Sequence, residues 1–371
     1  EKIYFNKNIK KIINDLKVKL PEKITNIFTA IRKISKTQNT KIYMVGGIVR
    51  DLILNIKNDD IDLVVEGNAI EFVKILIHEI PFKKVTFHEK FKTAIIYFDD
   101  NLKIDFASTR IEYYEFPSSL PNIEIGNIKD DLYRRDFSIN ALAIDLSDEN
   151  YNIIDYYDGY KDIMDKKIKI LHNLSFVEDP TRIIRAIRFA TRYDFHFDDT
   201  TLDLMYEAIS NGILKNLSWE RFRAELILIF KEKNFIKSIY FLNDLDIFKL
   251  IHKKIIINTE KIEEFDIISN SDLLKLENFD SWKLYFLKLL EELSKEELSF
   301  VLERFGFNKK FIEEYSFENS KIEEITAKLK KAFKNSQIYD ILSIIPNEIF
   351  VSSSSFASKN SMLFVFISIF F

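Results

Sequence analysis

The sequence predicts an α+β protein in which a small β-sheet near the N-terminus is followed by a long all-helical region. The chain has 371 residues, 47% of them hydrophobic, with only 7 glycines and 6 prolines, which favours a helix-rich protein of two or three domains. Short β-branched and aromatic runs gather between residues 41 and 146. From residue 180 onward, apolar residues recur three or four positions apart, the spacing of amphipathic helices.

The expected elements follow one another along the chain. Residues 1–38 carry apolar residues at helical spacing and predict one or two amphipathic helices. Residues 108–127 contain prolines and serines without a firm period and predict a mobile loop, in which Arg110 and Glu112 are the first residues to mutate. Strands are predicted at 41–45, 61–65, 84–97 (a hairpin), 103–107 and 141–146.

Composition excludes several kinds of site. The chain has no cysteine, which rules out disulfides and cysteine-ligated zinc and is compatible with the reducing cytoplasm, where we expect the protein. The sequence contains neither a G-x-x-x-x-G-K-[ST] loop nor a G-x-G-x-x-G motif, which argues against P-loop NTPases and Rossmann oxidoreductases. The formal charge is −4, so any RNA contact has to come from local basic surface.

Gly46 and Gly47 lie between a predicted strand and a predicted helix at 48–56. Paired glycines at the start of a helix let backbone N–H groups approach a phosphate closely, at the positive end of the helix dipole. This arrangement predicts an anion site.

Asp60 and Asp62 alternate with apolar residues, so the period of a strand places both carboxylates on one face. Neighbouring carboxylates repel each other, and bridging divalent cations relieve that repulsion. Next to a phosphate site, such a pair suits two-metal phosphoryl or nucleotidyl transfer. The alternative is a turn at Asp59 and Asp60 followed by a solvated strand residue.

Five motifs between residues 41 and 226 resemble, in the same order, those of the bacterial-type tRNA CCA-adding enzymes and poly(A) polymerases, a branch of the polymerase-β-like nucleotidyltransferases. The motifs are GGIVRD with DDID, RRDFSINA, the hinge-like DYYDGYKD, EDPTR and the R-x-x-x-E of RFRAE. The resemblance implies a polymerase-β-like catalytic head with a small mixed sheet, followed by an all-α neck, body and tail. The expected boundaries are 1–37 for an N-terminal helical extension, 38–149 for the head, 150–236 for the neck and 237–371 for body and tail.

The resemblance also implies roles for individual residues. Asp60 and Asp62 would hold Mg²⁺, and Asp105 on a neighbouring strand would complete the catalytic set, the alternative being a surface strand acid. Paired arginines suit a triphosphate, while an aspartate and an asparagine can bond ribose hydroxyls, although a structural ion-pair cluster is the alternative. The predicted nucleotide-binding residues are Gly46, Gly47, Arg50, Arg134, Arg135, Asp136, Asn140, Asp179, Arg182, Arg185 and Arg188.

Asp179 and Arg182 are predicted to read the incoming base. Asp179 suits a helix N-cap, with Pro180 in the first turn. An aspartate accepts a bond from the amine of cytosine or adenine, and an arginine donates to the acceptor on the pairing edge. Uracil and guanine present a carbonyl in place of that amine and would leave the aspartate unpaired. Glu178 is expected to orient Arg182.

Two further predictions concern the surroundings of this helix. Its arginines form a basic stripe. The alternative interpretation is a solvated face whose arginines pair with acids elsewhere in the chain. The R-x-x-x-E motif is expected to stiffen the base-reading helix, and a simple i,i+4 ion pair between Arg221 and Glu225 is the structural alternative.

The resemblance implies Mg²⁺-dependent addition of CCA, or part of it, to the 3′ end of tRNA from CTP and ATP without a nucleic-acid template. The alternatives are an A-adding or CC-adding partial enzyme, a poly(A) polymerase, and, from another class, a non-catalytic RNA-binding module. The body and tail are expected to grip the acceptor and TΨC arms of tRNA, with the lysines of 321–334 as candidate phosphate contacts.

The C-terminal segment Met362–Phe371 is apolar but too short to span a bilayer, so no membrane partner is expected. It is interpreted as a buried last helix or strand, a truncation, or an altered reading frame. The oligomeric state stays open.

Overall fold

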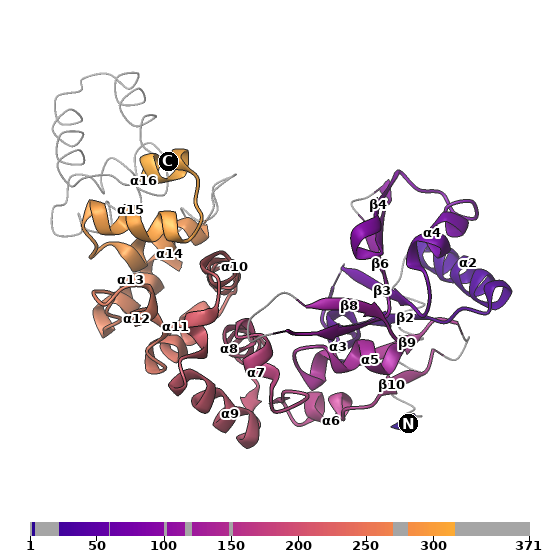
Figure 1. The fold of residues 1–371 in the computed structure, drawn as a ribbon, viewed down its shortest axis with the longest axis horizontal. Coiled ribbons are helices and arrows are strands. Elements are labelled where there is room, and N and C mark those ends of the chain that lie inside the picture. The colour runs from indigo at the N-terminus through magenta and orange to yellow at the C-terminus, as the bar shows by residue number, and fades with distance from the viewer. Residues whose placement is uncertain are drawn as a thin grey trace. The chain divides into compact units, whose positions relative to one another are not determined.

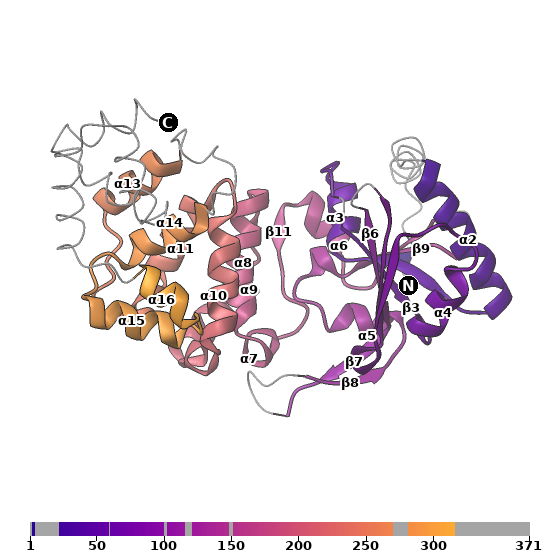
Figure 2. The same ribbon diagram turned by 90° about the horizontal axis from the view of Figure 1, so that it is seen from above.

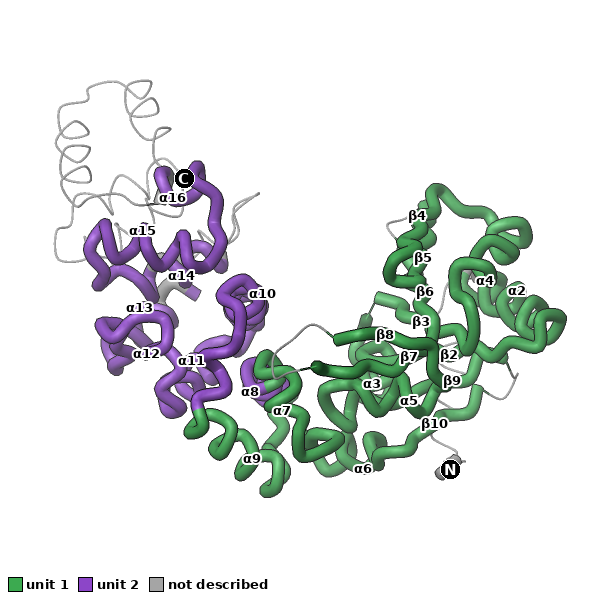
Figure 3. Tube along the Cα trace, viewed as in Figure 1, with its two compact units in different colours: residues 1–182, 193–211 green, residues 183–192, 212–371 purple. Residues whose placement is uncertain are grey.

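A computed structural model describes residues 2–3, 22–58, 60–99, 102–115, 121–147, 151–269 and 281–315. The chain forms two compact units, coloured separately in Figure 3. Unit 1 comprises residues 1–182 and 193–211, and unit 2 comprises residues 183–192 and 212–371. The predicted contacts at 321–334 and the apolar segment Met362–Phe371 lie outside the described residues.

Unit 1 is built on a mixed sheet of eight strands, which confirms the predicted α+β class (Figure 1). The strand pair β3–β6 is parallel, while the other neighbours in this sheet are antiparallel. The spatial order is β1 (Lys2–Ile3), β10 (Ile153–Asp155), β9 (Leu142–Asp145), β2 (Ile42–Val45), β3 (Ile61–Val65), β6 (Lys103–Ser108), β5 (Thr93–Tyr97) and β4 (Lys84–His88).

Helices cover both faces of this sheet, as Figure 2 shows. On one face lie α2 (Glu22–Gln38) and α4 (Ala69–Leu76), and α2 confirms the second predicted N-terminal helix. On the other face α5 (Ile128–Tyr133) packs its apolar residues against Tyr43, Val45 and Val64. Both faces therefore exclude water, so the central strands are apolar along most of their length.

Short elements surround the ends of the central strands. The turn after β2 leads into α3 (Gly47–Ile53), and the 3₁₀ helices η1 (Glu89–Phe91) and η3 (Ser138–Asn140) precede β5 and β9. Beyond the large sheet, unit 1 contains α6 (Gly159–Met164), the parallel pair β11 (Lys167–Ile168) and β12 (His196–Phe197), α7 (Ser175–Glu178) and α9 (Asp199–Ser210).

The predicted mobile loop at 108–127 is wrong for most of its length. Two strands, β7 (Arg110–Tyr113) and β8 (Asn122–Ile125), pair there as an antiparallel hairpin, while residues 116–120 lie outside the described part of the chain. β8 is exposed along its whole length and β7 is half-buried without a fully buried residue, so neither strand has the alternation of buried and exposed residues by which a strand is predicted.

Unit 2 is helical throughout its described residues, as predicted for the region from Lys237 onward. Its core holds many aromatic rings, among them Phe230, Phe235, Phe265 and Tyr285, whose centroids lie 4.3 to 6.4 Å apart. The helices are part of α8 (Thr181–Tyr193), η4 (Ile213–Asn216), α10 (Trp219–Phe230), α11 (Phe235–Asp244), α12 (Ile247–Ile251), α13 (Thr259–Ser269), α14 (Ser281–Leu290), α15 (Lys295–Arg304) and α16 (Lys309–Tyr315).

None of the helices in the described ranges is long and apolar enough to cross a membrane.

Candidate active site

Three acidic residues lie near the start of β3. Asp60 directly precedes β3, and Asp62 is its second residue. The parallel register of β3 and β6 places Asp105 directly beside Asp62. The third acid predicted from the sequence therefore lies next to the first two, because the parallel pairing joins strands about forty residues apart.

Lys103 supplies a positive charge between these acids. Its Nζ atom lies 3.1 Å from Asp105 Oδ2 and 3.5 Å from Asp60 Oδ1. The hydrogen bond to Asp105 is the main reason why the pKa of Lys103 is raised. Sequence reasoning did not single out this lysine, although its position two residues before Asp105 on a strand places both side chains on the same face.

The charge of these acids is only partly balanced. Although Asp62 is exposed, nearby protein atoms remove enough water to raise its pKa, and this is the largest cause of the shift. Arg135 opposes the rise, whereas Asp105 and Asp60 add to it. A bound cation would lower that pKa again by neutralising the repulsion.

The donor chemistry fits a hard divalent cation, which prefers carboxylate oxygens. Within the described ranges, however, no three acidic or histidine side chains converge closely enough to surround one ion. Asp60 and Asp62 would hold such a cation, with Asp105 beside them, and the cation would compete with the Lys103 ammonium for these acids.

Position 46 has to be glycine for two reasons, its backbone conformation and a close neighbouring side chain. Its φ is +77°, in the region that favours glycine, and a Cβ atom there would lie 2.7 Å from Arg135 Nη1. Its N–H donates to the Leu142 carbonyl at 3.3 Å, so this donor is already bonded within the head. The glycine thus lets Arg135 approach the turn before α3, and Gly47 opens that helix.

Arg50 was predicted to bind nucleotide, but the structure places it in a buried network. Its side chain is 4% exposed and donates to Asp51 Oδ1 at 2.8 Å and to Asn140 Oδ1. Its guanidinium also lies over the ring of Tyr193, 4.5 Å from the centroid. In this arrangement Arg50 holds α3 against the second motif.

The second motif is organised by Asp131, which the sequence analysis missed. Its buried carboxylate accepts from Arg134 Nη2 at 2.8 Å and from Arg135 Nη2 at 3.0 Å. Burial would raise the pKa of Asp131, but the two arginines outweigh burial and lower it. The i,i+3 and i,i+4 spacing on α5 was the available signal.

The rest of the second motif is also internally bonded. Asn140 Nδ2 donates to Asp136 Oδ1 at 2.8 Å, and the same oxygen accepts the Phe137 N–H. Arg134 Nη1 donates to Glu112 on β7 at 3.2 Å, which ties the hairpin to this motif. By contrast, the Nε of Arg135 is buried and has no hydrogen-bond partner in the part of the chain that the structure describes.

The third motif packs against the second. Gly159 allows α6 to approach closely, because a Cβ atom there would lie 2.1 Å from the Ser138 carbonyl oxygen. Ser138 Oγ donates to Asp162 at 2.6 Å, and Asp155 accepts the backbone N–H groups of Tyr157, Gly159 and Tyr160. These contacts are structural, consistent with a motif that the sequence analysis kept apart from the chemistry.

Asp179 caps α8, as predicted. Its Oδ1 accepts the Thr181 N–H at 3.0 Å and the Thr181 hydroxyl at 2.6 Å, while its carbonyl accepts the Arg182 N–H. Arg182 is buried and donates to Ser175 and to the Arg134 carbonyl.

Glu178 has a partner that was not foreseen. Its Oε2 lies 3.4 Å from His172 Nε2, and the His172 ring stacks on Tyr133 with centroids 5.1 Å apart. Burial, with a contribution from Arg182, lowers the pKa of His172 to about 4, so the imidazole is neutral at physiological pH. The partner shown for Glu178 is thus His172, whereas Arg182 was expected.

In unit 2, the remaining predicted arginines pair with acids. Arg185 Nη1 lies 3.2 Å and Arg188 Nη2 lies 3.3 Å from the Glu225 carboxylate, and Arg188 also lies 3.5 Å from Glu232. Glu225 therefore joins α10 to the helix that carries these arginines. This contact supports the predicted stiffening role of the fifth motif.

Comparison with known proteins places these features in a family. The Poly A polymerase head domain matches residues 42–169. An A-adding tRNA nucleotidyltransferase of Geobacter sulfurreducens is 41% identical over 283 residues, which are 75% of this chain and 32% of that protein. A solved CCA-adding enzyme, apo form II, is 36% identical with a TM-score of 0.78, over 94% of this chain and 82% of that one. The chain belongs to the CCA-adding enzyme family.

Another member of the family, the Thermotoga maritima CCA-adding enzyme, was solved in complex with tRNA and is 33% identical with a TM-score of 0.72. The alignment covers 94% of this chain and 81% of that one. By contrast, this chain spans about a third of the length of the Geobacter relative.

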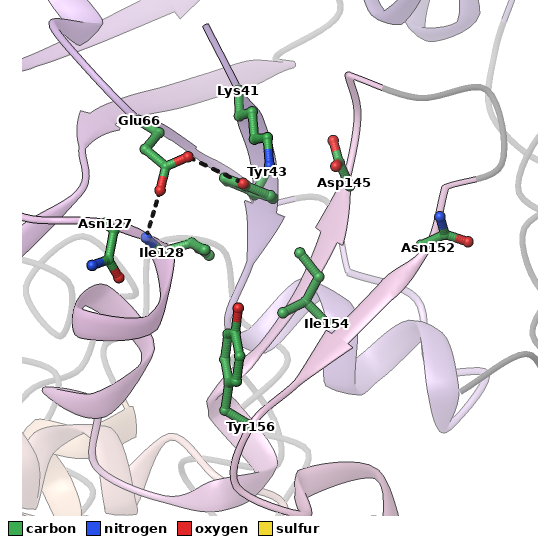
Figure 4. A pocket seen from close by; sticks show the side chains of 9 residues that line it. All are labelled: Lys41, Tyr43, Glu66, Asn127, Ile128, Asp145, Asn152, Ile154 and Tyr156. Carbon is green, nitrogen blue, oxygen red and sulfur yellow. Dashed lines mark hydrogen bonds between the residues drawn. The ribbon is translucent and has the colours of Figure 1, made fainter. Parts of the chain in front are cut away.

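A cavity of about 240 Å³ lies among residues of β2, β9 and β10 and the start of α5 (Figure 4). One of its lining residues is Glu66, which follows β3. Glu66 is four residues after Asp62, so along an extended strand the two residues are about 13 Å apart. Glu66 accepts from the Tyr43 hydroxyl and from the Ile128 N–H, and Asp145 accepts the Ser147 N–H. These acids have structural partners, and the cavity is separate from the candidate active site.

Proposed function

We propose that this protein transfers nucleotides from CTP and ATP to the 3′ end of tRNA without a nucleic-acid template. The observation that carries the proposal is the register of β3 and β6, which sets Asp105 beside Asp62 and close to Asp60. In the reaction the tRNA 3′ hydroxyl would attack the α-phosphate of the nucleotide, with release of pyrophosphate.

The proposed cofactor is Mg²⁺, held by Asp60 and Asp62 with Asp105 beside them. When bound, Mg²⁺ would lower the pKa of the attacking hydroxyl and stabilise negative charge on the triphosphate. The carboxylates would hold the metal ions, and the repulsion that Asp105 and Asp60 exert on Asp62 favours the binding of cations.

Arg135 is the proposed triphosphate contact. It lies against Gly46, and its buried Nε keeps a donor that no described residue accepts. A guanidinium with an unsatisfied buried donor gains most from a phosphate oxygen. Arg134, which is fully engaged with Asp131 and Glu112, would hold this region in place.

Base choice is assigned to Asp179 and Arg182. Capping leaves the Asp179 carboxylate at the start of the helix, and Arg182 is anchored a turn away. The pair would accept the amine of cytosine or adenine and donate to the adjacent ring nitrogen, which uracil and guanine do not match. Because the substrate would be tRNA, we also propose that the protein acts in the cytoplasm.

A second candidate is addition of the terminal A alone. The observation that favours it is the 41% identity to the Geobacter protein, which is an A-adding tRNA nucleotidyltransferase. The motifs described here serve both activities equally.

The test uses two tRNA transcripts, one lacking all of CCA and one lacking only the terminal A, each with single nucleotides and Mg²⁺. Incorporation of C and then A supports full CCA addition, whereas extension of the second transcript alone supports A addition. Asp60→Ala is the inactive control and should still bind tRNA. If the wild-type protein extends neither transcript, the proposed function is wrong.

A further inference from the structure

We infer that Ser175 is a positioning residue that sets the orientation of the Arg182 guanidinium for base choice, an inference that rests on the proposed function. Ser175 is the first residue of α7 and is fully buried, with 0% of its surface exposed. Its hydroxyl oxygen accepts from Arg182 Nη1 at 2.7 Å, whereas the Ser175 carbonyl is 3.5 Å from the same nitrogen. The hydroxyl is therefore the stronger acceptor.

A second anchor acts on the other terminal nitrogen of Arg182. Nη2 donates at 2.8 Å to the carbonyl of Arg134, the residue that follows the last turn of α5. Carbonyls at a helix end lack a partner within the helix, so this bond satisfies one of them. Two anchors on different nitrogens of a planar group fix both its place and its plane.

The two anchors come from different motifs. The Arg134 carbonyl belongs to the segment that carries the proposed triphosphate contact, while Ser175 lies on the short helix just before Asp179. Of the two, only the serine hydroxyl is removable by substitution. Arg182 is 4% exposed, so water has little access to replace a lost acceptor.

Loss of the Ser175 hydroxyl would leave Nη1 with the long carbonyl contact and let the guanidinium turn about its bond to Arg134. A misaligned donor reaches the carbonyl of uracil or guanine as readily as the ring nitrogen of cytosine or adenine. Because base choice depends on that alignment, selectivity should fall more than turnover.

The experiment measures kcat/KM for the nucleotide that the wild-type protein adds and for UTP and GTP, with tRNA as the acceptor. In Ser175→Ala the ratio of correct to incorrect nucleotide should fall by about tenfold or more, the factor expected for losing a bond to a charged group. Ser175→Thr, which keeps the hydroxyl, should have the same ratio of correct to incorrect nucleotide as the wild type. Ser238→Ala is the matched control, since it removes another fully buried hydroxyl, bonded to Thr191 at 2.6 Å.

Two further variants separate positioning from general damage. Ser175→Cys keeps the volume but weakens the acceptor, so it should lower the ratio even if the alanine variant folds poorly. In an Arg182→Lys background, Ser175→Ala should have no additional effect on the ratio. An unchanged ratio in the folded alanine and cysteine variants, or a full effect in the lysine background, overturns the inference.

Failure of this inference differs from failure of the proposed function. If the wild-type protein adds nucleotides selectively and the serine variants do so equally well, only the role of Ser175 is wrong. If the wild-type protein adds none, the proposed function itself is wrong.

Discussion

Asp62 and Asp131 lie in the same unit, and both interact electrostatically with Arg135, yet the pKa of Asp62 is raised from its ordinary value and that of Asp131 is lowered. Asp131 is buried and directly bonded to two arginines, which lowers its pKa. The pKa of Asp62 rises chiefly because nearby protein atoms remove water from its carboxylate, and the acids Asp105 and Asp60 add to the rise, while Arg135 only partly opposes it. The negative charge of Asp131 is therefore balanced by arginines within the fold, whereas that of Asp62 is left for a positively charged ligand to balance.

We expect the largest effect on enzyme activity from a substitution of Asp62. Asp62→Asn should reduce nucleotide incorporation by roughly a thousandfold, because the variant removes a charge that we propose holds a metal ion at the reacting centre. Its stability should not fall, since a raised pKa means that the ionised carboxylate is disfavoured by the fold. Single-turnover assays and thermal unfolding test both statements, and a marked loss of stability would contradict the comparison.

Asp131→Asn should show the reverse pattern, with stability as the main loss. Removing one partner of a buried ion pair typically costs about 3–5 kcal/mol, and here two arginines would lose their shared acceptor. Urea unfolding measures the free energy directly. Glu79→Gln is the control, because its pair with Lys33 is exposed and should contribute less than about 1 kcal/mol.

Acid should weaken the Asp131 cluster in a defined direction. The folded-state pKa of Asp131 is lowered, so its contribution is present above the unfolded value of about 3.9 and disappears as the pH falls through the folded pKa. Unfolding free energies measured between pH 6 and pH 3 for the wild type and for Asp131→Asn isolate the contribution of the ionised Asp131 carboxylate to stability. The difference between the two proteins should shrink toward low pH, and a constant difference would argue against the assignment.

The smallest expected effect concerns Lys103. Its ammonium lies between Asp60 and Asp105, where a metal ion would bind, and both contacts are partly exposed. Lys103→Gln should therefore lower the Mg²⁺ concentration needed for half-maximal activity, by about two- to fivefold. A metal titration of the initial rate tests this expectation. A higher requirement for Mg²⁺ would mean that the lysine assists the site instead of competing for it.

Much of the head was predictable from local patterns. The strands at 41–45, 61–65 and 103–107, and the cap at Asp179, follow from β-branched runs and from cap chemistry that act over a few residues. The hairpin at 110–125 was missed because neither of its strands carries an alternation of buried and exposed residues.

Partners distant in the chain account for most of what the sequence could not reveal. Arg50 stays a predicted nucleotide contact, and its sequence neighbours do not reveal that Asn140, ninety residues away, accepts a hydrogen bond from it. Likewise, nothing near Arg182 in the sequence indicates that the Arg134 carbonyl binds it. Tertiary contacts of this kind fix where a charged side chain is held, and residues far apart in the chain supply them.

The most direct test is a crystal structure with Mn²⁺ and a non-hydrolysable ATP analogue, read by anomalous scattering. We predict metal peaks at bonding distance, about 2.1–2.3 Å, from the carboxylates of Asp60 and Asp62, with Lys103 displaced from between the acids. A structure in which the nucleotide is bound, the metal lies elsewhere and Lys103 still bridges Asp60 and Asp105 would contradict this account.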